Sequence, residues 1–172
     1  VSNFDMTHRI DMTIAKHLVL TGEYDFRRSD TYNTARTNNY YYGTKPGEQI
    51  MVTGTTKSYK EVRSFRNSHV FNAYGTYEND WNGHYFKATA GMQYENYMSN
   101  QLSIKAWPIL NDAFDSFAQL SRGDDTTYDG PNQSISTFAT LGIFGRLNYD
   151  WKGRYIVEAS ARYDGTSRFA SG

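Results

Sequence analysis

Apolar and polar residues alternate along three pairs of neighbouring stretches in this chain. The alternation is clearest after residue 84, where one set of positions holds Phe86, Ala88, Ala90, Met92 and Tyr94, and the positions between hold Lys87, Thr89, Gln93 and Glu95. Successive side chains of a β-strand point to opposite faces, so a period of two indicates strands with one apolar and one polar face. The pattern predicts six strands arranged as three hairpins.

A turn sequence occurs twice, each time between two alternating stretches. The copies are Asp80-Trp81-Asn82-Gly83 and Asp150-Trp151-Lys152-Gly153, and the residues around them align without a gap. Short turns that contain Asn-Gly or a similar pair are typical of β-hairpins. The remaining hairpin, near the N-terminus, has its break at Lys16-His17 and lacks this signature.

The connections alternate in length along the chain. Short turns are predicted near residues 16–17, 80–83 and 150–153, and long polar connections near 29–60 and 99–136. Outer-membrane barrels have short periplasmic turns and longer extracellular loops, and their tilted strands need about 9 to 11 residues to cross the bilayer. The fold class predicted is all-β, an antiparallel up-and-down meander that forms an arc of a large transmembrane β-barrel. Six strands are too few to close such a barrel, which needs about eight.

The composition supports strands that contact an apolar medium. The 172 residues include fifteen Tyr, ten Phe and three Trp, but no apolar run long enough for a membrane-spanning helix. The formal net charge is zero, so no basic surface for nucleic acid is indicated. Indole rings favour the boundary between apolar and aqueous phases, and Trp81 and Trp151 are therefore expected in an aromatic girdle at the membrane interface.

Three segments resemble the SusC/RagA family of TonB-dependent outer-membrane transporters of the Bacteroidetes. Two of them lie near the C-terminus, FGRLNYDWKGRY at Phe144 to Tyr155 and RYDGTSRF at Arg162 to Phe169. The third, Phe71 to Tyr97, is similar to the hairpin that precedes them in such barrels. The regions between these segments fit the variable extracellular loops of the family.

This resemblance implies a protein much larger than the chain. Its members have a barrel of about 22 strands, a plug domain in the lumen, an N-terminal segment that contacts TonB, and a SusD-like lipoprotein outside. They import glycans, oligosaccharides or peptides. Residues 1–172 are therefore expected to be a central part of the barrel in the bacterial outer membrane, in contact with lipid or lipopolysaccharide. The plug domain and the TonB-contact region are expected to lie outside the chain, and no cofactor is expected.

Two sets of residues are candidates for contact with substrate or plug. The first set lies on the polar faces of the last hairpin and either lines the lumen or forms a ladder of salt bridges: Arg146, Glu158, Arg162 and Asp164. The second set consists of aromatic residues in the long connections: Tyr40, Tyr41, Tyr42 and Trp107. Their rings either stack on sugar rings or peptide side chains of the substrate, or they pack against other loops or against the lipoprotein.

Catalytic and metal-binding motifs are missing from the sequence. The four histidines have no ligand spacing, and no G-x-S-x-G nucleophile motif occurs, so neither a metal site nor enzymatic activity is expected. The alternative to a membrane wall is a soluble or secreted β-sandwich, for example an adhesin-like binding module. In a sandwich the apolar faces pack against each other at about 10 Å. A second layer facing the apolar side would therefore distinguish the two.

Overall fold

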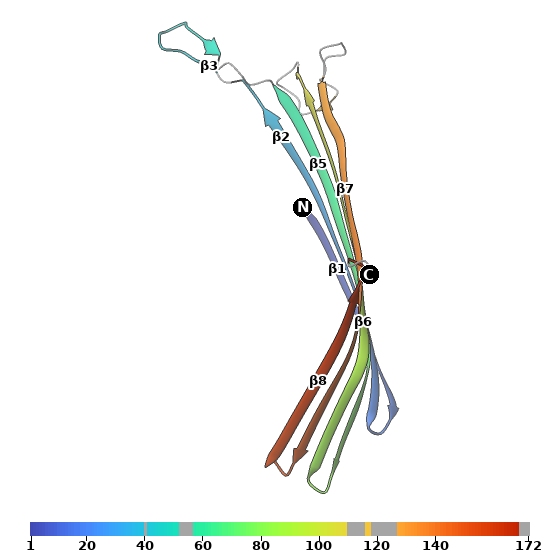
Figure 1. The fold of residues 1–172 in the computed structure, drawn as a ribbon. Helices are drawn as coiled ribbons and strands as arrows, with labels where there is room; N and C mark the ends of the chain where they lie inside the picture. The colour runs from blue at the N-terminus through green and yellow to red at the C-terminus, as the bar shows by residue number, and fades with distance from the viewer. Residues whose placement is uncertain (40, 52–56, 110–115, 118–126, 169–172) are drawn as a thin grey trace. The chain divides into compact units, whose positions relative to one another are not determined.

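The computed structural model describes residues 1–39, 41–51, 57–109, 116–117 and 127–168. Six long strands form one antiparallel sheet in the order β1-β2-β5-β6-β7-β8, so the strands of this sheet follow one another in chain order (Figure 1). Their bounds are Ser2–Ala15 for β1, Leu18–Thr37 for β2, Ser58–Trp81 for β5, His84–Trp107 for β6, Thr127–Trp151 for β7 and Tyr155–Thr166 for β8. The predicted meander of six strands in three hairpins is confirmed.

A second, small sheet joins β3 (Tyr41–Tyr42) to β4 (Ile50–Met51), with Tyr41 opposite Met51 and Tyr42 opposite Ile50. It lies inside the first predicted long connection and was not predicted. No helix in the described part of the chain is long and apolar enough to cross a membrane.

The hairpin turns lie where the sequence predicts them. Asn82 and Gly83 have φ angles of 51° and 82°, and Lys152 and Gly153 have φ angles of 53° and 66°. A type I′ turn needs positive φ at both central residues, a conformation that suits the right-handed twist of paired strands. The Lys152 amide donates a hydrogen bond to the Gly83 carbonyl at 2.7 Å, so the two repeated turns lie next to each other.

The strands extend beyond the predicted membrane-crossing portions. β2 continues to Thr37 and β5 begins at Ser58, while β6 continues to Trp107 and β7 begins at Thr127. The connections therefore span 38–57 and 108–126, which is shorter than the predicted 29–60 and 99–136. Alternation ends before the strands do, because the backbone hydrogen bonds of a sheet do not themselves require a regular exchange of apolar and polar side chains.

Contacts divide the chain into two units, and β1, β2, β5, β6 and β7 contribute residues to both. The first unit contains Val1–Ser2, Asp30–Phe65 and Asn100–Ile135, and the second contains Asn3–Ser29, Arg66–Ser99 and Ser136–Gly172. In the first unit, Tyr59, Ala106 and Ile109 form a small buried cluster, with the Phe117 ring 5.0 Å from that of Tyr59. They are the buried hydrophobic residues of the described chain.

The second unit is a single layer with two chemically different faces. Its apolar face carries exposed aliphatic side chains, among them Ile10, Met12, Leu20, Met92, Leu141, Ile143, Leu147 and Val157. The opposite side, called the polar face below, carries ion pairs between neighbouring strands. Among the described residues no second layer covers the apolar face, which is the layer that a β-sandwich would require. A single layer with one apolar and one polar face is what the alternation predicts.

Candidate functional site

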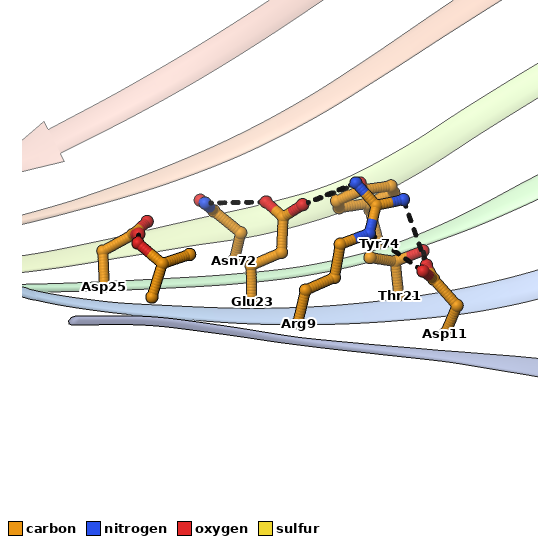
Figure 2. Close-up of polar contacts among 8 residues, drawn as sticks. Arg9, Asp11, Thr21, Glu23, Asp25, Asn72 and Tyr74 are labelled. Atoms are coloured by element: carbon orange, nitrogen blue, oxygen red, sulfur yellow. Dashed lines mark hydrogen bonds and ion pairs between the residues drawn. The ribbon is translucent and has the colours of Figure 1, made fainter.

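The polar face of β1, β2 and β5 holds a connected network of charged and hydroxyl groups (Figure 2). The Arg9 guanidinium lies 2.9 Å from the Asp11 carboxylate and 3.0 Å from that of Glu23. Asp11 also accepts a hydrogen bond from the Thr21 hydroxyl at 2.6 Å. Glu23 accepts further bonds from the Tyr74 hydroxyl at 3.3 Å and the Asn72 amide at 3.4 Å. The network joins three strands, and two carboxylates, those of Asp11 and Glu23, form ion pairs with Arg9.

The predicted polar residues of the last hairpin also lie on this face, in two pairs. Arg146 contacts Glu158 at 2.8 Å, and Arg162 contacts Asp164 at 2.8 Å. Arg162 donates a further hydrogen bond to the Gln93 side chain on β6 at 2.8 Å. The first pair joins β7 to β8, whereas Arg162 and Asp164 both lie on β8. Contact of these residues with plug or substrate stays a prediction.

Gly142 explains how Arg162 reaches across a strand. In the β7–β8 register Gly142 is opposite Asp164, so it lies between the residues that Arg162 joins. A Cβ atom at Gly142 would lie 2.6 Å from the terminal nitrogen of Arg162 and would also overlap the Asp164 carboxylate. The missing side chain leaves a gap over β7 through which the guanidinium contacts Gln93.

Aromatic rings gather at two levels on the apolar face of the second unit. At the turns, the His84 ring stacks on Trp81 at 5.9 Å and on Trp151 at 6.1 Å. Trp151 also stacks on Tyr155 at 5.6 Å. This group, the turn aromatic cluster, contains both tryptophans that the sequence predicts for a girdle.

The second level, the upper aromatic cluster, was not predicted. The Phe26 ring lies 4.8 Å from His69 and 6.0 Å from Phe4, and Tyr24 stacks on His69 at 6.2 Å. The Tyr24 hydroxyl and His69 Nδ1 are 2.8 Å apart and hydrogen-bonded. The alternation places all four on the apolar face, but their proximity depends on the pairing of β1, β2 and β5.

The spacing of the two clusters can be compared with the thickness of a membrane. Along β5, twelve residues separate His69 of the upper cluster from Trp81 of the turn cluster. At about 3.3 Å per residue this is about 40 Å along the strand, or about 30 Å along a barrel axis for a tilt of about 40°. The hydrocarbon core of a bilayer is also about 30 Å thick. The aliphatic zone of the apolar face therefore has the height that a membrane requires.

The loop aromatics that the sequence proposes for substrate contact are in the first unit. Tyr41 and Tyr42 form β3 and are exposed. Trp107 ends β6, with the Lys105 ammonium 5.3 Å from its ring centroid. Tyr40 lies outside the described residues. The structure thus places Trp107 at a strand end rather than in a loop, because β6 is longer than the alternation indicates.

A polar-face pocket of about 240 Å³ in the second unit is a further feature that the sequence did not single out. Its lining includes Arg27, Arg66, Ser68 and Tyr97, which come from β2, β5 and β6. Alternation alone could have assigned each residue to the polar face, but it does not align one strand with the next.

Comparisons of the sequence with known proteins find relatives of one kind, the TonB-dependent receptors. No family model matches the chain. TonB-dependent receptor P26 of Formosa agariphila is 24% identical over 149 residues, which are 86% of this chain and 14% of that protein. TonB-dependent receptor P39 of the same organism is 27% identical over 105 residues, 61% of this chain and 10% of that protein. The chain thus spans about one seventh of the length of P26.

Solved structures share the fold. The RagAB peptide transporter aligns with a TM-score of 0.80 at 19% identity, over 97% of this chain and 18% of that one. The RagAB peptide importer in its open-open state aligns with a TM-score of 0.81 at 20% identity, over 97% and 17%. The class is therefore an all-β arc of a barrel wall of the type in these structures. The named relatives and this fold together confirm the resemblance to SusC/RagA-type TonB-dependent transporters that the sequence motifs indicate.

Proposed function

We propose that the chain is a wall segment of an active transporter in the bacterial outer membrane, energised through TonB. The observation that carries the proposal is the single-layer sheet with two different faces. On the apolar face, the aliphatic zone between the two aromatic clusters is about as tall as the hydrocarbon core of a membrane. The polar face carries ion pairs. Side chains that face lipid need no polar partner, whereas charges in a water-filled lumen are hydrated or paired. The names of the sequence relatives, which are receptors rather than enzymes, support the same assignment.

The orientation that we propose follows from the unequal connections. The turns at 16–17, 82–83 and 152–153 face the periplasm, and the connections 38–57 and 108–126 face the outside. The turn aromatic cluster with Trp81 and Trp151 is then the periplasmic girdle, and the upper aromatic cluster is the outer one. The polar face lines the lumen, where Arg146, Glu158, Arg162 and Asp164 contact water or a plug domain.

The cargo that we propose is a glycan, an oligosaccharide or a peptide, delivered with the help of a SusD-like surface lipoprotein. The structural neighbours are named as peptide transporters or importers, which supports a small polymeric cargo. The segment supplies wall and vestibule, and the plug and TonB-contact region belong to other parts of the transporter.

Uptake by the complete transporter tests this function. We expect a strain that lacks it to stop accumulating one class of labelled oligosaccharide or peptide, and loss of TonB to abolish the same uptake. Co-purification of a surface lipoprotein from detergent extracts checks the partner. Undiminished uptake in both strains, or fractionation of the protein away from the outer membrane, would contradict the proposal.

Substitution of Tyr41 and Trp107 by alanine tests the loop aromatics. Both rings are at least partly exposed, so we expect weaker substrate binding by about thirtyfold for the double variant, since each stacking contact contributes about 1 kcal/mol. Affinity is measured by calorimetry on the purified transporter, with exposed Tyr128→Ala as the control. Equal affinity of the double variant and the unaltered protein would remove these residues from the binding site.

A further inference from the structure

A hollow crosses the apolar face of the second unit over β2, β5, β6 and β7. It has a volume of about 590 Å³ and is called the apolar groove below. Small residues of β5 and β6 form its floor, and longer side chains of β2, β6 and β7 stand beside them. The floor residues are Ala73, Gly75 and Ala90, and the wall residues include Leu20, Met92 and Leu141.

Almost all of the surface inside the apolar groove is apolar. Thr21 and Tyr74 also line it, but their side chains are engaged on the polar face. The Thr21 hydroxyl donates a hydrogen bond to Asp11 at 2.6 Å, and the Tyr74 hydroxyl donates one to Glu23 at 3.3 Å. The described lining residues thus present no side-chain hydrogen-bond partner to the groove. Such a site suits a ligand without polar groups, for example a hydrocarbon chain.

The height of the apolar groove follows from residue counts along its strands. On β5, Gly75 is six residues from His69 of the upper aromatic cluster and six from Trp81 of the turn aromatic cluster. On β7, Leu141 is ten residues from Trp151. At about 3.3 Å per residue and a tilt of about 40°, these positions are about 15 and 25 Å from the turn cluster along a barrel axis. The groove therefore begins at the middle of the aliphatic zone and extends toward the upper cluster.

This position distinguishes the two leaflets of the membrane. In the orientation proposed above, the upper aromatic cluster marks the outer boundary of the hydrocarbon core. Each leaflet fills about half of that core, or about 15 Å. An acyl chain of the outer leaflet thus runs alongside the groove, whereas a chain of the inner leaflet ends where the groove begins. The outer leaflet of the bacterial outer membrane consists of lipopolysaccharide, whose acyl chains belong to its lipid A anchor.

Packing gives the groove an advantage over the flat parts of the wall. Lipid tails are as apolar as leucine, so a chain gains no hydrophobic energy when it moves from bulk lipid to the protein. On a flat wall the chain has protein atoms on one side, but in the groove it has them below and on both sides. Each additional atom pair at contact distance contributes dispersion energy. The groove therefore orders and retains a chain that the rest of the wall does not.

We propose that the apolar groove binds one acyl chain of an outer-leaflet lipid, the lipid A part of lipopolysaccharide. This inference rests on the proposed transport function, which places the apolar face in the outer membrane, and it adds a defined lipid site to the wall. The chain enters from the side of the upper aromatic cluster and ends near Gly75. The Leu20 side chain lies over the sheet there, since a Cβ atom at Gly75 would be 3.2 Å from Leu20 Cδ2.

A cryo-electron microscopy map of the complete transporter in nanodiscs that contain lipid A tests the site. We expect ordered density for one chain in the groove, continuous with headgroup density at the upper aromatic cluster. The Gly75→Leu/Ala90→Leu variant fills the floor and should remove this density. Its matched control, Ala159→Leu/Ala161→Leu, adds the same side chains to β8 outside the groove and should leave the density unchanged. An empty groove in the unaltered transporter, or a chain that enters from the turn side, would overturn the proposal.

The lipid that stays bound through purification identifies the source of the chain. Native mass spectrometry of the transporter extracted from outer membranes should show bound lipopolysaccharide, with retention at least about tenfold lower for the groove-filling variant than for the β8 control. Retention of phospholipid alone, or equal retention by the two variants, would contradict the proposal. Heat-modifiable migration on a gel shows whether each variant is folded, and the map of the unaltered transporter decides the question without any variant.

Lipid binding requires no import, so this inference and the transport function fail separately. TonB-dependent uptake by a transporter whose groove is empty rejects the lipid site alone. A lipid chain in the groove of a protein whose loss leaves uptake unchanged rejects the transport function alone.

Discussion

Replacing Ile143 by arginine is expected to lower the stability of the complete transporter in lipid by about 2 to 4 kcal/mol. Ile143 is 59% exposed on the apolar face, within the aliphatic zone between the two aromatic clusters. Its surroundings would be hydrocarbon, which offers a guanidinium neither water nor a counter-ion. The measurement is the unfolding free energy after refolding into vesicles, or the fraction of folded protein in the outer membrane.

Ile156→Arg is the matched control for this substitution. Ile156 is also exposed, at 73%, but it lies opposite Asp150 on the polar face and two residues from Glu158. The same isoleucine-to-arginine change there adds a charge to a water-lined wall near carboxylates, so we expect a change below about 1 kcal/mol. Equal losses of stability for the two variants would mean that lipid contact does not distinguish the two faces, and the assignment of the faces would be wrong.

Gly91→Ala is expected to be the most damaging small substitution on the polar face. A Cβ atom at Gly91 would lie 2.5 Å from the Ala73 carbonyl oxygen and 2.7 Å from the Tyr74 Cα. These are backbone atoms of the neighbouring strand, so β5 and β6 would have to separate locally, whereas a side chain could turn away. Overpacking of this kind costs about 1 to 3 kcal/mol. The measurement is the apparent midpoint of thermal unfolding in detergent, followed by loss of heat-modifiable migration on a gel.

Gly22→Ala separates this steric effect from the general effect of removing a glycine. A Cβ atom at Gly22 would have no neighbour within 4 Å, and its backbone is ordinary extended strand. The added methyl group restricts the unfolded chain, so we expect unchanged or slightly higher stability, by less than about 1 kcal/mol. If Gly22→Ala lost as much stability as Gly91→Ala, the contact of the added Cβ atom with Ala73 and Tyr74 would not be the cause of the loss in Gly91→Ala.

The strands, their order and their two faces were predictable because each depends on local information. A period of two assigns Ile10 and Met12 to one face and Arg9 and Asp11 to the other, with no knowledge of any partner strand. Asn-Gly and Lys-Gly at the centres of the repeated turns predict hairpins, and both pairs have the positive φ angles of such turns. With short turns, a chain of hairpins gives a meander.

The polar and aromatic clusters could not be predicted, because they depend on how distant strands align. Glu23 accepts hydrogen bonds from Asn72 and Tyr74, about fifty residues away, and Arg162 bonds to Gln93 through a gap that Gly142 leaves. A shift of one strand by two residues would keep every face and change each of these contacts. The small β3–β4 sheet and the extension of the strands were missed for a related reason, since no regular alternation of apolar and polar residues marks these segments.

The sequence by itself thus determined the elements, their order and the chemical character of each face, because a strand repeats every two residues wherever it lies. Only the tertiary structure decided which charges are neutralised and which are not. It pairs Arg9, Arg146 and Arg162 with carboxylates, and it lets Arg162 reach Gln93 on a strand that is not its neighbour. The physical reason is that ion pairing depends on distances of a few ångströms between neighbouring strands, and these distances are set by inter-strand register and by glycines such as Gly142.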